Sequence, residues 1–328
     1  MKMTLIKVDN LHVHFPVEEG TVKAVKGISF EINSGETLAI VGESGCGKST
    51  TAHALMQLLS SPGVIADGSM LFNKTDLAKQ SDKYMQTIRG KDIAMIFQEP
   101  MTSLNPVIKV GEQIAETVRV HTGASKKEAW KKAVEMMDHV GIATPERRAE
   151  QYPHQMSGGM RQRAMIAMAL ACEPKLLIAD EPTTALDVTI QAQILRLMRK
   201  LQKEFNTAIL FITHDLGVVA EMADRVAVMY LGTLVEEASV EQIFYRPQHP
   251  YTQGLLRSVP DVSKKAKRLN QITGTVPTLS NMPKGCPFHP RCEKATAKCQ
   301  KQVPKLRDIA GHKVACFHAS TESEVSHQ

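Results

Sequence analysis

Three glycines, a lysine and a serine in one short segment could together hold a phosphate group. The segment 42–50 matches the pattern G-x-x-x-x-G-K-[ST]. Its glycines let consecutive backbone N–H groups curl round an anion with no Cβ in the way. Lys48 would reach the β- and γ-phosphates, and Ser49 would offer its hydroxyl to Mg²⁺. We therefore predict a site for a nucleoside triphosphate, ATP, at Gly42, Glu43, Ser44, Gly45, Cys46, Gly47, Lys48, Ser49 and Thr50.

The elements on either side are those that this pattern requires. Residues 37–41 form an apolar run typical of a buried strand, and residues 50–59 have helical character. A helix that begins at Lys48 would add the positive end of its dipole to the phosphate site.

Polar side chains also follow three further apolar strands. Asp180 and Glu181 end one of them, Gln98 follows the second and His214 follows the third. Because ligands bind outside the carboxyl ends of parallel strands, we expect these side chains to converge on one crevice. Asp180 and Gln98 would ligate Mg²⁺, and Glu181 would activate a water. Taken alone, a Gln or His at a strand end is usually an ordinary polar terminus, so the assignment depends on the whole series.

Two further positions suit a nucleotide. Ser157 is placed as the N-cap of an apolar helix, and Gly158 and Gly159 would expose N–H groups at its positive end. Phe15 ends a strand ahead of a polar loop, where an exposed ring could stack on a base. The alternative for Phe15 is an ordinary aromatic side chain in the core of an edge strand.

The rest of the chain mixes strand and helix patterns. Residues 2–32 alternate apolar and polar positions, as half-buried strands do. Residues 100–156 are mainly helical, with a capping box at Ser125. Residues 225–237 have the pattern of a hairpin. The sequence therefore predicts an α/β protein.

Charge divides the chain into a body and a tail. Of the net charge of +6, residues 257–328 hold 13 Lys and Arg against 5 Asp and Glu, whereas residues 1–256 are slightly acidic. The body is therefore not a basic nucleic-acid binder. No run approaches the roughly 20 apolar residues of a membrane-spanning helix, and the first residues have no secretory pattern. We expect a location inside the cell, where thiols stay reduced.

Together, these motifs resemble the nucleotide-binding subunit of ABC transporters across nearly all of residues 1–256. The resemblance implies a P-loop ABC-type nucleotide-binding domain with a parallel-sheet core, an antiparallel β subdomain and a helical subdomain at about 100–165. Gly42–Thr50 is similar to the Walker A loop, Leu176–Asp180 with Glu181 to Walker B, and Ser157-Gly158-Gly159 to the signature motif. Phe15 falls at the A-loop position, Gln98 at the Q-loop, Ala185-Leu186-Asp187 at the D-loop and His214 at the switch histidine.

Longer segments resemble the oligopeptide/dipeptide permease branch of that family. They are Phe97–Pro106, Tyr152–Arg163, Glu181–Gln193 and His249–Leu256, the last of which introduces a C-terminal extension in that branch, here 257–328. Met160 departs from the general signature, where many members carry Gln, and a thioether cannot hydrogen-bond a ribose well. The branch implies an ATPase that powers uptake of oligopeptides or dipeptides.

The resemblance also implies that two ATP molecules are sandwiched between two such subunits. The loop of one subunit would bind each ATP, and Ser157, Gly158, Gly159 and Asp187 of the other would cap it. Glu181 would orient or deprotonate the attacking water, and His214 would hold the γ-phosphate. The expected partners are a second ABC ATPase in a heterodimer, two transmembrane permease subunits and an extracytoplasmic peptide-binding protein. The chain would lie at the cytoplasmic face of the cell membrane.

Four of the six cysteines lie in the tail, at Cys286, Cys292, Cys299 and Cys316. Prolines interrupt any continuous helix there, so the four could converge on turns. The spacing matches neither the usual zinc pattern nor the ferredoxin runs, and disulfides are not expected in a reducing compartment. The resemblance implies a [4Fe–4S] cluster, because extensions of this kind in peptide-permease subunits hold one. Zinc and free thiols are the alternatives.

Other functions share parts of this pattern. The same ATPase could serve import of nickel or another small solute, because other proteins select the substrate. Repair ATPases of the superfamily insert long coiled coils where this chain has about 60 residues, and its translation factors carry two phosphate loops. A non-catalytic subunit would lack Glu181 or His214. These features disfavour the last three classes.

Overall fold

The computed structural model describes residues 3–98, 103–184, 187–258, 272–278 and 282–319. The chain forms two compact units, each assembled from separated segments. The helical unit comprises Met1–Leu5, Ile32–Glu36 and Lys79–Phe211, and the loop unit comprises Ile6–Glu31, Thr37–Ala78 and Ile212–Gln328. The predicted C-terminal extension therefore belongs to the same unit as the phosphate loop.

An antiparallel sheet in the loop unit has the strand order β2-β1-β4-β5. Its strands are β1 (Thr4–Val17), β2 (Gly20–Asn33), β4 (Val64–Phe72) and β5 (Thr75–Asp76). The pairing of β1 with β4 shifts register between Asp9 and His12, where Asn10 has a φ of +49°. Gly68 packs against this irregularity, since a Cβ on it would lie 2.4 Å from the carbonyl oxygen of Asn10. The predicted antiparallel subdomain is present.

A second run of strands in the loop unit has the order β11-β12-β10-β9-β3. These strands are β3 (Thr37–Val41), β9 (Arg225–Tyr230), β10 (Thr233–Ser239), β11 (Arg307–Ile309) and β12 (His312–Val314). β3 pairs in parallel with β9, and β9 and β10 form the predicted antiparallel hairpin. β12 pairs antiparallel with β10. Strands of the extension therefore continue the sheet whose strand β3 leads into the phosphate loop.

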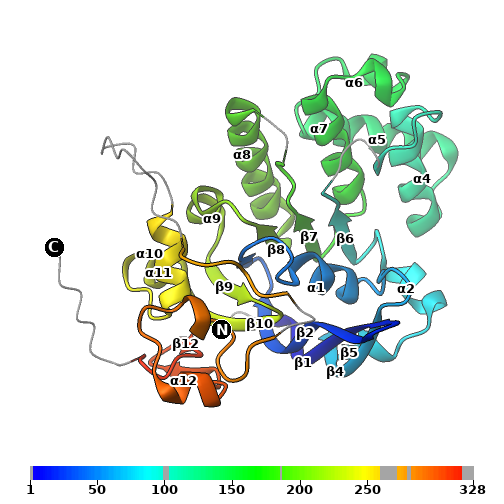
Figure 1. Cartoon of the computed structure of the whole chain (residues 1–328). Coiled ribbons are helices and arrows are strands. Elements are labelled where there is room, and N and C mark those ends of the chain that lie inside the picture. Colours follow the sequence, from blue (N-terminus) through cyan, green and yellow to red (C-terminus); the bar gives the residue numbers. More distant parts are fainter. Residues whose placement is uncertain (1–2, 99–102, 185–186, 259–271, 279–281, 320–328) are drawn as a thin grey trace. The chain divides into compact units, whose positions relative to one another are not determined.

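Aromatic side chains from three segments meet in the core of the loop unit. The ring centroids of Tyr230 and Tyr251 are 4.6 Å apart, and Phe288 lies 5.3 Å from Tyr230 and 5.4 Å from Tyr251. Phe288 comes from the extension, so burial of its ring ties the extension to the core. The helices of this unit are α1 (Lys48–Leu55), α9 (Leu216–Met222), α10 (Val240–Tyr245), α11 (Pro250–Arg257) and α12 (Ala297–Lys301), with 3-10 turns at Leu77–Lys79 and His289–Arg291 (Figure 1).

The helical unit combines a parallel strand pair with a group of helices. β6 (Ile93–Ile96) pairs in parallel with β7 (Leu176–Asp180), and β8 (Ala208–Thr213) follows β7 in the sheet. The helices are α2 (Asp82–Ile88), α4 (Val110–Thr122), α5 (Lys126–His139), α6 (Pro145–Ala149), α7 (Gly158–Leu170) and α8 (Val188–Phe205), with a 3-10 turn at Pro153–Gln155. Figure 1 shows α4 to α7 as one group, and Ser125 caps α5 with the predicted capping box. Among the helices described, none is long and apolar enough to cross a membrane.

Candidate functional site

The phosphate loop follows β3, and its glycines are required for two different reasons. Gly42 and Gly47 have φ angles of +155° and +106°. A Cβ on Gly42 would lie 2.1 Å from the carbonyl oxygen of Met229, and one on Gly47 would lie 2.6 Å from that of Ala24. Gly45 has a φ of +77° but open space around it, so only its backbone conformation calls for glycine. The loop is therefore tightly packed at both ends and open in the middle.

Lys48 places a buried cation inside this loop. Its side chain is almost fully buried, and Nζ donates to the carbonyl oxygens of Gly42 at 2.8 Å and Glu43 at 3.2 Å. Ser49 and Thr50 are half-buried in the first turn of α1. The ammonium group, the Ser49 hydroxyl and the start of a helix thus lie together, as a site for a metal-bound phosphate requires.

Two side chains that the sequence analysis did not single out hold Glu43 of the loop. Arg291 donates from Nη1 to one carboxylate oxygen of Glu43 at 2.7 Å and from Nη2 to the other at 3.0 Å. The hydroxyl of Tyr251 accepts from the backbone N–H of Glu43 at 2.9 Å. Hydrogen bonding to Glu43 raises the pKa of Arg291 above the ordinary value of an arginine, which is already high, so the guanidinium stays charged. No local pattern reveals these partners, because they lie 248 and 208 positions from Glu43.

In the helical unit, the register of two parallel strands brings Gln98 to Glu181. Ile96 of β6 is paired with Ala179 of β7, and each polar residue follows its paired position by two. Gln98 Nε2 donates to a carboxylate oxygen of Glu181 at 3.3 Å. Thr184, another residue the sequence analysis did not assign, donates from Oγ1 to the same oxygen at 2.9 Å.

The two neighbouring acids differ in environment. Asp180 ends β7 and is 2% exposed, whereas Glu181 is half-buried. Glu181 also has a φ of +46°, a left-handed conformation that a non-glycine residue adopts only at a cost. The amide of Gln98 and the hydroxyl of Thr184, which donate to the same carboxylate oxygen, hold the Glu181 side chain in one orientation.

The predicted signature residues and Asp187 meet at an open pocket of about 440 Å³ in the helical unit. Ser157 caps α7 and Asp187 caps α8, each accepting a hydrogen bond from a backbone N–H of its own helix. Two helix N-termini thus border the same pocket, an arrangement that favours an anion. The pocket is lined by Ser157, Gly158, Gly159, Met160, Arg163, Asp187 and Ile190. Ala185 and Leu186 of the predicted D-loop lie outside the described residues.

His214 and Phe15 belong to the loop unit. The side chain of His214 is exposed at the end of β8, directly before Asp215, which caps α9. Phe15 is half-buried, and its ring packs so closely on Gly63 that a Cβ there would lie 2.6 Å away. Stacking of Phe15 on a base and contact of His214 with a phosphate both stay predictions.

Comparison with known proteins decides the family. A family model described as ABC transporter matches residues 25–184, and a second, the oligopeptide/dipeptide transporter C-terminal region, matches residues 235–299. The oligopeptide transport ATP-binding protein AppD of Bacillus subtilis is 54% identical over 316 residues, 96% of each chain. This protein belongs to the ABC transporter ATP-binding family. The dipeptide transport ATP-binding protein DppD of the same organism is 54% identical over 323 residues, 98% of this chain and 96% of its own.

Solved structures support the same family. The ATP-binding cassette MJ0796, in a dimeric post-hydrolysis state bound to ADP and phosphate, is 29% identical with a TM-score of 0.64, covering 72% of this chain and 98% of its own. CbiO1 from Clostridium perfringens is 28% identical with a TM-score of 0.63, covering 74% and 91%. The predicted ABC cassette fold is confirmed, and with it ATP hydrolysis that uses Mg²⁺.

The four tail cysteines of this ABC ATPase converge on one small cavity in the loop unit. Cys286, Cys292, Cys299 and Cys316 all line it, and its volume is about 10 Å³. All four are free thiols, and burial raises the pKa of Cys286 to about 11. In the described part of the chain, no group of three or more His, Cys, Asp or Glu is arranged to hold a metal ion. The thiols meet as expected, but the structure gives no support for a cluster. Cys46 and Cys172 lie elsewhere, the first buried and the second half-buried.

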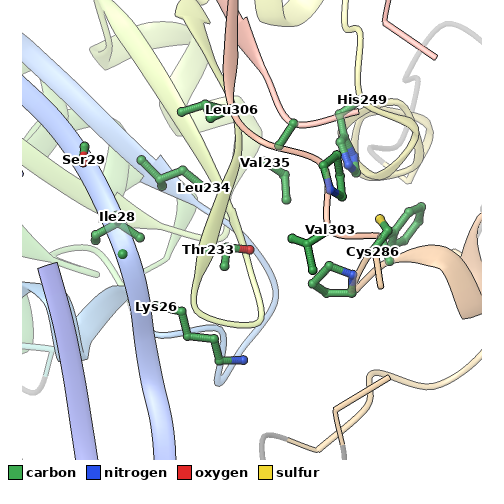
Figure 2. Close-up of a pocket in the computed structure, with 15 residues that line it drawn as sticks. Lys26, Ile28, Ser29, Thr233, Leu234, Val235, His249, Cys286, Val303 and Leu306 are labelled. Atoms are coloured by element: carbon green, nitrogen blue, oxygen red, sulfur yellow. The ribbon is translucent and has the colours of Figure 1, made fainter. Parts of the chain in front are cut away.

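A separate pocket of about 370 Å³ lies beside Cys286 (Figure 2). Lys26 Nζ, at its edge, donates to the carbonyl oxygen of Leu231 at 2.8 Å, and burial lowers the pKa of Lys26 to about 8. Burial lowers the pKa of His249 to about 4, and its Nδ1 accepts from the N–H of Tyr251 at 3.0 Å. None of the predicted ATP-binding residues lines this pocket, so it is distinct from the phosphate loop.

Proposed function

We propose that this ABC ATPase powers the uptake of oligopeptides or dipeptides across a membrane. The observation that carries the proposal is 54% identity over more than 300 residues to relatives named oligopeptide and dipeptide transport ATP-binding proteins. The match of residues 235–299 to the oligopeptide/dipeptide transporter C-terminal region points to the same substrate class. The phosphate loop and Glu181 would be the main groups in ATP hydrolysis.

The phosphate loop would bind the triphosphate. Its backbone N–H groups and the Lys48 ammonium would surround the β- and γ-phosphates. Mg²⁺, with Ser49, Gln98 and Asp180 as its protein ligands, would supply positive charge to the same phosphates. Phe15 would stack on the base. The near-complete burial of Lys48 supports this assignment, because a buried cation is stabilised by a bound anion.

Glu181 would be the group that orients or deprotonates the attacking water. Its carboxylate oxygen accepts from both Gln98 and Thr184, which fixes its direction before the substrate arrives. Such preorganisation reduces the cost of reaching the transition state. His214 would hold the γ-phosphate in register with Glu181.

The open signature pocket supports a shared active site. Ser157, Gly158, Gly159 and Asp187 would cap the ATP that is bound by the loop of a second subunit. The solved cassette MJ0796 is described as dimeric. For this chain we propose a heterodimer with a second ABC ATPase, in which closure around two ATP molecules completes both sites.

The remaining partners would be two transmembrane permease subunits and an extracytoplasmic peptide-binding protein. The helices of segment 103–156, together with Gln98, would transmit closure of the ATPase dimer to the permeases. The chain would then lie at the cytoplasmic face of the membrane as a peripheral subunit.

The substrate class is tested by complementation. A strain that lacks this gene should lose uptake of labelled di- and oligopeptides, and the wild-type gene should restore it. Lys48→Ala should not restore uptake, because the loop loses its cation, whereas a matched change of an exposed lysine on α8, Lys200→Ala, should. Unchanged peptide uptake in the deletion strain, or loss of nickel uptake alone, would overturn the peptide assignment.

We also propose that the four tail cysteines hold a [4Fe–4S] cluster. Four thiols line one cavity, with Cys299 on α12, and four thiolates are the number of ligands that such a cluster takes. A cavity of about 10 Å³ has room for roughly one water, so binding of a cluster would require the segments that carry the four thiols to move apart. Bound there, it would crosslink Cys286, Cys292, Cys299 and Cys316.

Metal analysis after anaerobic purification tests this proposal. The wild-type protein should contain about four iron and four sulfide per chain, and Cys299→Ser should lose both. Cys172→Ser, outside the cavity, is the matched control and should keep them. Zinc, or no metal, in the anaerobic wild-type protein would refute the cluster.

A further inference from the structure

The phosphate loop is attached to the C-terminal extension through the side chain of one loop residue. The Arg291 guanidinium binds both carboxylate oxygens of Glu43, at 2.7 Å and 3.0 Å. The Arg291 side chain is 4% exposed and that of Glu43 is 27% exposed. Such a bidentate, largely desolvated pair has a defined geometry, which an exposed ion pair lacks.

Arg291 is itself held by the surrounding protein. Its Nε donates to the carbonyl oxygen of Thr273 at 3.2 Å, and Nη1 reaches the hydroxyl of Tyr230 at 3.5 Å. The guanidinium carbon lies 5.9 Å from the centre of the Tyr230 ring. Arg291 also directly precedes Cys292, one of the four clustered cysteines. The two Nη atoms of the guanidinium therefore face Glu43 in a fixed orientation.

The backbone of Glu43 is held as well. Its N–H donates to the Tyr251 hydroxyl at 2.9 Å, and Tyr251 belongs to α11, which leads into the extension. Glu43 comes directly after Gly42, where the loop begins to curl. Two contacts, one to the side chain and one to the main chain, thus fix the position of Glu43 at the start of the phosphate loop.

Charge gives Arg291 a second effect. A carboxylate beside a site for a triphosphate repels the ligand unless a cation neutralises it. Because Arg291 is charged and nearly dehydrated, it cancels the Glu43 charge at short range. Loss of Arg291 would leave an unpaired negative charge in the loop.

We propose that Arg291 of the extension is a positioning residue for the phosphate loop, which it acts on through Glu43 and with the help of Tyr251. This inference rests on the proposed ATP site. By linkage, a nucleotide that binds the positioned loop also stabilises the extension. The extension is thus coupled to ATP binding within one chain, and the environment of the four cysteines is coupled with it.

A double-mutant cycle on the full-length protein tests the proposal. Binding of a fluorescent ATP analogue with Mg²⁺ is measured for the wild type, Arg291→Met, Glu43→Gln and the double variant. Arg291→Met should weaken affinity by about tenfold, within the usual range for coupled sites. In the Glu43→Gln background, Arg291→Met should cost much less further affinity, because the contact between the two side chains is already broken. Arg291→Lys should fall between, since lysine keeps the charge but not the fork.

Lys305→Met is the matched control, because it removes one positive charge from an exposed position of the extension. It should bind the nucleotide like the wild type.

A second readout is hydrogen exchange of residues 286–299, which ATP should slow in the wild type and not in Arg291→Met. Arg291→Met that binds like the wild type, or an equal loss of affinity from Arg291→Met with and without Glu43→Gln, would overturn the positioning role of Arg291. If Arg291→Met does not fold, Arg291→Lys with and without Glu43→Gln decides the same point. Failure of the wild type to bind would instead contradict the ATP site itself.

Discussion

The phosphate loop and the signature pocket are both proposed to contact phosphate, yet the chain restrains the first and leaves the second open. The loop is restrained from within: Gly42 and Gly47 are tightly packed, Lys48 is buried, and Glu43 is held by Arg291 and Tyr251. At the signature pocket, Ser157 and Gly158 are exposed, and a Cβ on Gly158 would meet nothing within 4 Å.

This difference agrees with the half-site proposed for each region. A loop that binds its own ATP gains from preorganisation by its own chain, because the ordering cost is met on folding. A surface that caps the ATP of another subunit must stay accessible until that subunit arrives. Interference with the loop should therefore impair binding by the isolated chain, and interference with the pocket should appear only when two subunits assemble.

The largest expected effect separates hydrolysis from binding. Glu181→Gln should lower phosphate release by about 10²- to 10⁴-fold, because the amide cannot accept the proton of the attacking water. The affinity of the loop for ATP should stay near the wild-type value, since Lys48 and its loop are unchanged. Phosphate release by the assembled transporter measures the first and nucleotide titration the second. Glu204→Gln, at an exposed position of α8, is the matched control, and undiminished hydrolysis by Glu181→Gln would contradict the role of Glu181.

One added methyl group should have different effects in the two regions. Gly42→Ala should destabilise the chain by about 1–3 kcal/mol or more, because the new Cβ would lie 2.1 Å from the carbonyl oxygen of Met229. Gly158→Ala should change the free energy of unfolding by less than about 0.5 kcal/mol. It should instead reduce ATPase activity of the assembled dimer by crowding the capped phosphate. Thermal unfolding and ATPase assays measure the two effects, and equal losses of stability would mean that the two regions do not differ as described.

A further effect, spread over about two pH units, concerns the pH dependence of the core next to the loop. Burial holds the pKa of His249 near 4, below the 6.5 of the unfolded chain. The neutral ring is therefore favoured by folding: its stabilising effect is complete above pH 6.5 and is lost as the pH falls toward 4. The whole change amounts to about 3 kcal/mol.

His249→Asn keeps an N-cap acceptor for the N–H of Tyr251 but cannot titrate. Denaturant unfolding at pH 6.5 and 4.5 should show a smaller loss of stability in this variant than in the wild type. Identical losses would show that protonation of His249 does not govern this region.

Local patterns accounted for much of the site. The G-x-x-x-x-G-K-S segment, the strand that ends in Asp180 and the cap at Ser157 were predictable, because each depends on residues a few positions apart. The pairing of Gln98 with Glu181 could be anticipated in kind, since parallel strands place their carboxyl ends together. The donor Thr184 was missed because one threonine in a loop carries no distinctive pattern.

The sequence by itself predicted a triphosphate site at Gly42–Thr50 and the residue types that surround it, because the pattern of a phosphate loop depends on residues a few positions apart. Only the tertiary structure decided that Arg291 and Tyr251 hold Glu43, and that β12 continues the sheet beside β10. Those contacts join residues more than 70 and up to 248 positions apart. Packing of the aromatic core around Tyr230, Tyr251 and Phe288 brings them together, and no short-range pattern in the chain encodes that meeting.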